Sequence, residues 1–229
     1  RLSLVGSEMC IRDRVTYIYD IFSKKLTEVA PFTVDLLLPS GAENLNYVLY
    51  TDESPYKMQR EWLDRLPFDI YSVNVHTGAK RLIGRSYRTA PKWSVNGKWA
   101  VMYDPIAQVW NKFDGATGKV VNISDAIGYP MFMESYDKPA PAPAYGIAGW
   151  TADGNNVFLY DAYDWWKTDL TGERQPECLT KGYGRKHGKS IRKMTSNIDK
   201  DVFQKDEKVI VSLWDKDTML SLIHISEPT

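Results

Sequence analysis

The chain has 229 residues and is poor in the side chains that bind metals and act as nucleophiles. It has two cysteines and three histidines, too few for a disulfide framework or a multi-cysteine metal site. His76 and His187 have no metal-ligand spacing around them, and we interpret both as surface residues. The sequence therefore predicts neither a metal nor a cofactor.

An excess of charge of one sign is also missing, because 29 basic side chains balance 29 acidic ones. Nucleic acids and anionic membranes select basic surfaces, so we expect no nucleic-acid partner. No apolar run approaches the roughly 20 residues of a membrane-spanning helix, and we expect no membrane span. Hydrophobic residues still make up 43% of the chain, which is enough for a buried core.

The Gly-x-Ser-x-Gly nucleophile elbow of α/β-hydrolases does not occur in this sequence. The stretch Gly182–Ser190 is similar to a phosphate-binding loop, but Tyr183 occupies the position where that motif requires its first glycine. We interpret the stretch as a solvated basic loop. No residue of the chain is assigned a catalytic role.

The two ends of the chain encode each other. If residues 5–14 are written as the codons GTG GGC TCG GAG ATG TGT ATA AGA GAC AG, the reverse complement begins CTG TCT CTT ATA CAC ATC TCC GAG CCC AC. That strand translates as Leu-Ser-Leu-Ile-His-Ile-Ser-Glu-Pro-Thr, which is the sequence of residues 220–229. Unrelated peptide ends do not match in this way by chance, and the DNA resembles a transposase-type sequencing adapter ligated to both ends of an insert.

We therefore expect residues 1–14 and 220–229 to be adapter-derived tails that are not native. Residues 15–219 are then the genuine segment, an internal fragment of a longer protein. The alternative, an amphipathic native N-terminus and an apolar C-terminal strand, does not explain the coding match. The charge of the chain stays balanced without the tails, so the exclusions above are unchanged.

Aromatic residues are abundant and occur in repeats. The stretch 91–104 resembles the stretch 148–161, with tryptophan, glycine, tyrosine and aspartate all recurring at an offset of 57 residues. A second repeated pattern places an aromatic strand before a Thr-Gly pair and a charged residue, in residues 69–80, 109–119 and 164–174. An earlier partial copy lies at 46–52. Repeats of this period are typical of propellers and solenoids.

The chemistry of the repeats favours strands. Asn96-Gly97 and Asp153-Gly154 are signals for two-residue type I′ hairpin turns, and alternating aromatic and β-branched residues flank them. Helical periodicity is weak, with residues 62–66 the best short candidate. Each repeat thus reads as four antiparallel strands, which is one propeller blade. An ordinary antiparallel sandwich would explain the strands but not the shared offset.

We predict an all-β fold, an incomplete β-propeller in which 15–219 is a partial propeller domain. About three whole four-stranded blades are expected at 34–85, 90–124 and 147–181. The residues from 15 to 29 would form the outer half of an earlier blade, and a later one would run from Lys189 to Asp215. In such a blade, all the tight turns lie on one face and the long connections on the other.

The long connections, residues 53–68, 125–145 and 181–188, are the expected place for binding. Four aromatic residues in or beside them are predicted to face a substrate or partner: Trp62, Tyr129, Phe132 and Tyr136. The tryptophans on third strands, Trp110, Trp165 and Trp166, are instead expected to pack between blades. We interpret Asp161, Asp164 and Asp169 as strand-edge and turn carboxylates, because they lack the spacing of a calcium loop.

The Trp-Ser-x-x-Gly-Lys and Trp-Thr-x-Asp-Gly hairpins resemble those of periplasmic Tol-type propellers and of the N-terminal propellers of prolyl oligopeptidase-family serine peptidases. Two stretches favour the second family. Residues 145–151 with 160–172, and residues 179–185, are similar to segments of large secreted bacterial members. The resemblance extends over essentially all of 15–219.

The resemblance implies a parent peptidase with a propeller that screens peptide substrates and a C-terminal α/β-hydrolase domain bearing a Ser-Asp-His triad. None of the triad lies in this chain. It further implies a periplasmic or secreted parent. Dipeptidyl-peptidase members hold the substrate's amino terminus with propeller glutamates, and the long loops here contain no Glu-Glu pair. The alternative is a non-enzymatic propeller of the Tol type that binds a protein or glycan through its long-loop rim.

Overall fold

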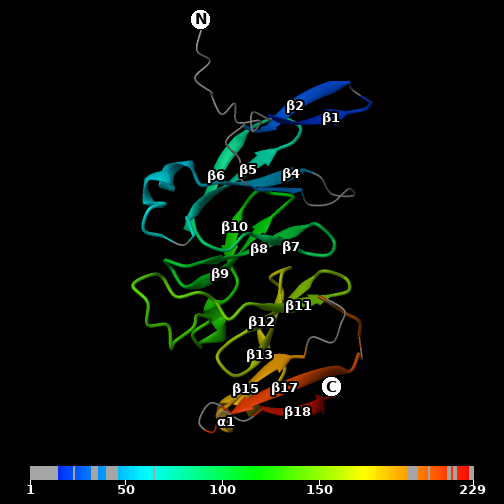
Figure 1. Cartoon of the computed structure of the whole chain (residues 1–229). Coiled ribbons are helices and arrows are strands. Elements are labelled where there is room, and N and C mark those ends of the chain that lie inside the picture. Colours follow the sequence, from blue (N-terminus) through cyan, green and yellow to red (C-terminus); the bar gives the residue numbers. More distant parts are fainter. Residues whose placement is uncertain are drawn as a thin grey trace, which may run out of the picture. The chain divides into compact units, whose positions relative to one another are not determined.

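A computed structural model describes residues 15–22, 24–31, 36–39, 46–63, 65–194, 201–205, 207–215, 218 and 221–226 (Figure 1). The chain divides into two compact units. The first lies within residues 1–39 and 45–88, and the second consists mainly of residues 89–229. Each unit is built almost entirely from antiparallel strands.

The first unit contains a two-stranded sheet, β1-β2, and a four-stranded sheet in the order β3-β4-β5-β6. The only described helix in this unit, η2, is a 3-10 helix at Ser54–Gln59 between β4 and β5. The strands are β1 (Thr16–Asp20), β2 (Lys25–Ala30), β3 (Leu36–Pro39), β4 (Tyr47–Asp52), β5 (Phe68–Asn74) and β6 (Lys80–Tyr87).

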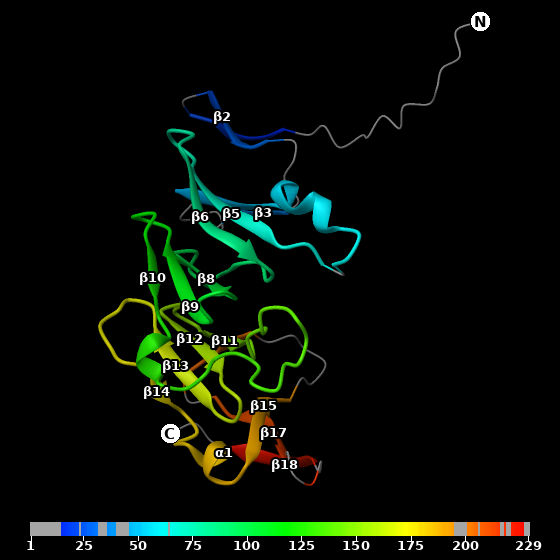
Figure 2. The same cartoon turned by 90° about the vertical axis from the view of Figure 1, so that its left-hand side faces the viewer.

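The second unit contains three sheets, in the orders β10-β9-β8-β7, β14-β13-β12-β11-β16 and β15-β17-β18. The short helices are η3 (Asp125–Ile127) and α1 (Tyr183–Lys186), and α1 lies against β15 (Figures 1 and 2). The strands are β7 (Lys92–Trp93), β8 (Trp99–Asp104), β9 (Val109–Asp114), β10 (Val120–Asn122), β11 (Ile147–Thr151), β12 (Asn156–Tyr160), β13 (Trp165–Asp169), β14 (Glu177–Cys178), β15 (Lys189–Lys193), β16 (Val202–Phe203), β17 (Val209–Asp215) and β18 (Ser221–Ser226).

Successive four-stranded antiparallel meanders are the blades of a β-propeller. The chain is all-β, an incomplete β-propeller with three four-stranded blades, β3–β6, β7–β10 and β11–β14, as the repeats predict. The blade bounds agree with the predicted ones to within a few residues. Partial blades precede and follow them: the β1-β2 hairpin and the sheet β15-β17-β18.

The repeated Thr-Gly pairs close the third strand of each blade onto the fourth. At the end of β9, the Asp114 carboxylate accepts the backbone N–H groups of Ala116 and Thr117 at 2.8 and 3.3 Å. The Asn74 side chain accepts the equivalent two N–H groups after β5, and the Asp169 carboxylate after β13 accepts those of Thr171, Glu173 and Arg174. The glycine that follows has a positive φ in every copy, a conformation that glycine adopts without a steric cost.

The first-to-second strand turns carry the sharpest repeat, but they are not type I′ turns. Gly97 donates its N–H to the Ser94 carbonyl at 2.9 Å, and Gly154 donates to Thr151 at 2.8 Å. Only the glycines have positive φ, so each loop is a turn followed by a left-handed glycine. The side chains of Asn96 and Asp153 accept the N–H two residues ahead, as in an Asx turn.

The apolar core of the second unit lies between its sheets. One cluster joins Trp110 on β9 with Trp150 on β11 and Leu159 on β12. A second cluster joins Trp165 on β13 with Ile191 and Leu213 of the next sheet. Trp110 and Trp165 are 3% and 7% exposed and pack between blades as predicted, whereas Trp166 is half-buried and packs only at the margin of the first cluster.

The partial blade after Lys189 departs from a simple meander. Strand β16 leaves it and pairs in parallel with β11 of the preceding blade, Trp150 opposite Val202. The fit requires Gly149, whose φ is +155° and where a Cβ would lie 2.5 Å from the Phe203 ring and 2.6 Å from the Asp201 carbonyl. The parallel strand was not predicted from the sequence.

Two further expectations, one for a helix and one for the C-terminal tail, can be compared with the structure. The weak helix signal at 62–66 is wrong, since the helical turn lies earlier, at Ser54–Gln59, where Pro55 stands near its start. Strand β18 lies inside the predicted adapter-derived tail and pairs with β17. This pairing concerns only geometry, so the origin of residues 220–229 stays a prediction.

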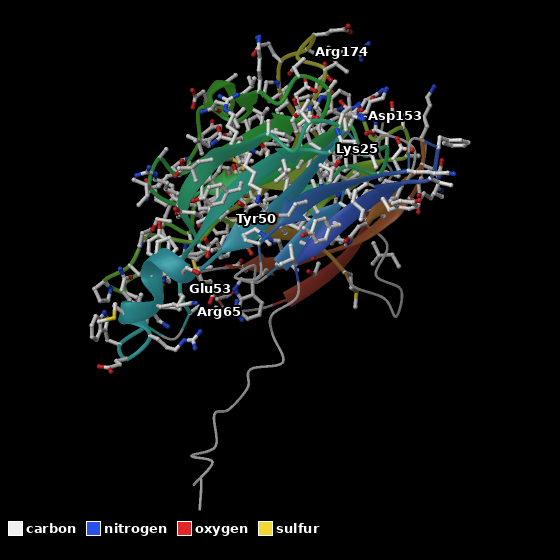
Figure 3. All side chains as sticks on the ribbon, turned by 90° about the horizontal axis from the view of Figure 1, so that it is seen from above. Lys25, Tyr50, Glu53, Arg65, Asp153 and Arg174 are labelled. Carbon is white, nitrogen blue, oxygen red and sulfur yellow. The ribbon has the colours of Figure 1, made fainter. Side chains whose placement is uncertain are left out.

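Loops sort to the two ends of the strands as expected. In the second unit, Asp153 of the β11–β12 turn and Arg174 of the β13–β14 turn lie at the same end (Figure 3). In the first unit, Glu53 and Arg65 of the long β4–β5 connection lie at the end opposite Lys25 of the β1–β2 turn (Figure 3). The antiparallel order of the strands thus gathers the long connections on one side of each unit.

Candidate functional site

A shallow depression of about 340 Å³ lies on the long-loop side of the second unit. Three connections supply its walls: the crossing between β10 and β11, the β12–β13 connection and the crossing between β14 and β15. Its lining residues are Tyr129, Asp164, Trp166, Cys178, Gly182, Arg185 and Lys186.

Asp161 is the buried anchor beneath this depression and is 0% exposed. One carboxylate oxygen accepts the backbone N–H groups of Tyr163 and Asp164 at 2.6 and 2.5 Å. The other oxygen accepts the Trp166 indole N–H at 3.1 Å and the Arg185 guanidinium at 3.0 Å. A buried charge with four donors is compensated, and it fixes both the indole and the guanidinium in place.

Asp164, 1% exposed, holds the β14–β15 crossing in place. Its carboxylate accepts the Thr180 hydroxyl at 2.6 Å and the backbone N–H groups of Gly184 and Arg185 at 2.9 and 3.0 Å. Gly184 is required by close approach, because a Cβ there would lie 2.6 Å from the Tyr163 carbonyl and 2.9 Å from the Asp164 carboxylate. Asp164 thereby determines where Arg185 leaves the backbone.

Arg185 is the charged group at the wall of the depression. Its guanidinium carbon lies 4.0 Å from the centroid of the Tyr129 ring and 5.1 Å from that of Tyr163. Burial alone would lower the pKa of Arg185, but the hydrogen bond and charge of Asp161 raise it above its ordinary value. The side chain keeps 31% of its surface exposed, so it can meet a ligand.

Arg192 on β15 supports the site from below. Its guanidinium donates to the backbone carbonyls of Asp161 and Ile191 at 2.7 Å each, and it lies 4.6 Å from the Tyr160 ring centroid. Burial lowers the pKa of Arg192 and raises that of Tyr160. Because its guanidinium donates to backbone carbonyls of both segments, Arg192 ties the β12–β13 connection to the next sheet.

The four aromatic residues predicted to face a ligand lie in different settings. Tyr129 is 44% exposed, lines the depression and lies 5.8 Å from the Trp166 ring. Phe132 packs against the core and pairs with Ala144 in an isolated bridge. Tyr136 is half-buried, and its backbone N–H donates to Met133. Trp62 lies in the first unit and is 68% exposed. Whether any of them faces a ligand stays a prediction.

Sequence reasoning missed the most structured part of the site. Asp161 and Asp164 were interpreted as strand-edge and turn carboxylates, and the basic loop as wholly solvated. Both aspartates do lie at a strand end and in a turn, but the structure also buries their carboxylates and draws Arg185 and Arg192 into the protein. The sequence did contain a possible signal for this site, which was Asp161 three residues before Asp164 and a glycine before Arg185. No spacing rule, however, connects residues 20 positions apart.

Several kinds of chemistry find no support in the described ranges. Among these residues, no three His, Cys, Asp or Glu side chains gather closely enough to hold a metal ion. No described helix has the length and apolar character needed to cross a membrane. What the depression does offer is two aromatic rings, one fixed guanidinium and one exposed ammonium, which are groups for binding.

Comparison with known proteins gives likenesses of fold only. No family model and no curated protein matches the chain. Among solved structures, TolB from Acinetobacter baumannii is 13% identical with a TM-score of 0.36, the match covering 93% of this chain and 49% of TolB. The β-propeller domain of the Trilobed protease from Pyrococcus furiosus is 9% identical with a TM-score of 0.32, covering 88% and 70%.

An acylaminoacyl peptidase is 11% identical with a TM-score of 0.33, and the match covers 85% of this chain and 32% of the peptidase. The chain thus spans about half the length of the Acinetobacter TolB and about a third of the peptidase. Peptidase propellers and Tol-type propellers both occur among these structures. They do not distinguish between the two functions.

Proposed function

We propose that this chain belongs to the substrate-gating propeller of a prolyl oligopeptidase- or dipeptidyl-peptidase-like serine peptidase. The parent would be a periplasmic or secreted hydrolase whose catalytic domain follows the propeller. The chain itself would bind and admit peptides, while the chemistry would be carried out by a serine of the other domain with a histidine as base and backbone amides for the oxyanion.

One observation supports this proposal above the others. The two stretches that carry the peptidase resemblance are separate in sequence, yet they build the same site. Asp161, Asp164 and Trp166 come from the first stretch, and Thr180 and Arg185 from the second, joined by the hydrogen bonds described above. Parts of both of the more specific stretches meet in this one depression, which a shared site explains better than shared propeller geometry alone.

The test is serine-directed labelling of the full-length parent protein. The DNA downstream of codon 219 is read first, and we expect an open frame that contains Gly-x-Ser-x-Gly. The full-length product is then treated with a fluorescent fluorophosphonate, which should label it, while a variant with that serine changed to alanine should stay unlabelled.

A frame that completes the propeller and then ends would overturn the proposal. The chain would then be part of a non-enzymatic binding propeller of the Tol type. The same sequencing reads across both ends of the insert. Finding codons 4–14 and 220–229 in the genome would show that these residues are native.

A further inference from the structure

The guanidinium of Arg185 is fixed in place, but only some of its N–H donors are hydrogen-bonded to described residues. Tyr129 and Tyr163 lie against it, Asp161 holds one of its nitrogens, and Asp164 holds its backbone N–H. A side chain held in this way loses little conformational entropy when it binds a ligand. The geometry is therefore prepared for binding before any ligand arrives.

Most of its donors have no acceptor in the described part of the chain. The single hydrogen bond of its side chain goes to Asp161, and its Nε is buried without a partner. A guanidinium has five N–H donors in a planar fork that matches a carboxylate. Lys186, which lines the same depression, is exposed and forms no ion pair with a described residue.

The acidic groups beneath the depression are already engaged. Asp161 accepts four hydrogen bonds and Asp164 accepts three. Arg185, Lys186 and Arg192 therefore stand against two engaged carboxylates, an excess of one positive charge before Glu134 is counted. Exposed Glu134 is near enough to interact electrostatically with Arg185 and opposes an anion.

We propose that this depression binds the carboxylate of a peptide, with Arg185 as the carboxylate ligand and Lys186 as a second, weaker contact. The Tyr129 and Trp166 rings would contact the apolar part of the same residue. A planar fork with little excess positive charge around it favours a carboxylate over a dianionic phosphate. The carboxylate could be a chain terminus or an aspartate side chain. This inference rests on the proposed function, because it takes the ligand to be a peptide.

The experiment measures binding of three small peptides to the full chain by tryptophan fluorescence and calorimetric titration. The probes are N-acetyl-glycyl-phenylalanine, its C-terminal amide, and N-acetyl-aspartyl-phenylalanine amide. We expect the free acid to bind about tenfold or more tightly than its amide, since a charged hydrogen bond is lost. Binding of the aspartyl amide identifies the side-chain carboxylate as a source, and its failure identifies the chain terminus.

Variants test the residues named. Arg185→Gln should weaken binding of the acid about tenfold and leave binding of the amide unchanged. Glu134→Gln should tighten binding by removing the opposing charge, and because this side chain is exposed, folding should be unaffected. The matched control is Arg174→Gln, an exposed arginine of the β13–β14 turn at the other end of the strands, which should change nothing.

Equal affinity for the acid, its amide and the aspartyl amide would overturn the inference, as would a Glu134→Gln variant that binds the preferred carboxylate probe no more tightly. If Arg185→Gln fails to fold, the Glu134 variant and the acid–amide ratio still decide. Fluorophosphonate labelling of the parent is independent of these measurements. If the parent is labelled but the chain shows no preference for a carboxylate, the proposed peptidase function stands and only the proposed carboxylate site is rejected.

Discussion

Asp104 and Asp161 occupy the same position in successive blades, at or just after the end of the second strand, but they accept different numbers of hydrogen bonds. Asp104 accepts the backbone N–H groups of Ile106 and Ala107, both at 2.9 Å. Asp161 makes the equivalent turn and in addition binds Arg185 and Trp166. The repeat supplies the turn, and the crossing after β14, which carries Arg185, converts one copy of it into a site.

The same contrast holds between the two ends of the strands. At the tight-turn end, Asn96 and Asp153 are repeats of one another and touch directly, the Asn96 amide donating to the Asp153 carbonyl at 2.8 Å. At the long-loop end, each crossing has its own length and contacts. Regular contacts therefore maintain the blade stack, whereas binding groups arise where the repeat is broken.

The largest expected effect comes from removing the anchor. Asp161→Ala should destabilise the chain by about 3–5 kcal/mol, because it leaves a partly buried guanidinium and an indole N–H without their acceptor. Asp104→Ala removes only a turn and should cost about 1 kcal/mol. Urea unfolding followed by tryptophan fluorescence measures both losses of stability. Equal losses would mean that Asp161 contributes no more than the turn it shares with Asp104.

A substitution at Gly149 tests the parallel strand that no repeat predicts. Gly149→Ala should cost roughly 2–4 kcal/mol, since a methyl group would meet the Phe203 ring and the Asp201 carbonyl in addition to the strain at positive φ. Gly128→Ala is the matched control. Its φ is +72° with no atom within 4 Å of the added Cβ, so it reports only the strain, about 1 kcal/mol. Urea unfolding of the two variants separates the terms.

Acid should affect the tight-turn end through three carboxylates. The Thr151 hydroxyl lowers the pKa of Asp153 below its usual value. Burial opposes the shift for Asp114 and Asp169, but turn N–H groups still lower the pKa of each. A depressed native pKa contributes stability above the unfolded pKa of about 4, and that stability is lost as the pH falls further.

Replacing these three aspartates with asparagine should therefore lower stability at neutral pH, where the contribution of the carboxylates is present, and change it little near pH 2, so that the stability profile below about pH 4 becomes flatter. Urea midpoints collected between pH 2 and 7 provide the measurement. A profile as steep as that of the unaltered chain would assign the acid sensitivity to other groups.

The smallest effect is expected at the surface of the tight-turn end. Arg174→Ala should change stability by less than about 0.5 kcal/mol, because its exposed side chain has no described partner. A larger loss of stability in the same urea assay would mean that the charge of Arg174 stabilises this end of the strands in addition to the repeated turns.

The fold could be predicted from the sequence because the repeat is local. Trp93 and Trp150, or Gly97 and Gly154, recur in the same order, and a strand–turn–strand pattern needs only neighbouring residues to be recognised. The type I′ prediction was wrong at the same local scale, because only Gly97 and Gly154 have positive φ and each loop is a turn followed by a left-handed glycine.

The site could be predicted only in part. Its place on the long-loop side followed from strand parity, and Tyr129 was identified as a residue of that side. The role of Arg185 could not be predicted. Its partner Asp161 lies 24 positions away in the sequence, and the two side chains meet only after two strands and a crossing have folded. Buried charge pairs of this kind are determined by tertiary contacts, which composition and spacing do not encode.

Strand β16 has a consequence for how the protein is made. Its partner β11 is some fifty residues earlier in the chain, so on the ribosome the β11–β14 sheet is finished on one edge only when residues 202–203 emerge. Until then the exposed N–H and C=O groups of Trp150 and Thr151 are open to other strands. Translation speed through residues 152–203 thus sets how long the nascent chain is exposed to mispairing.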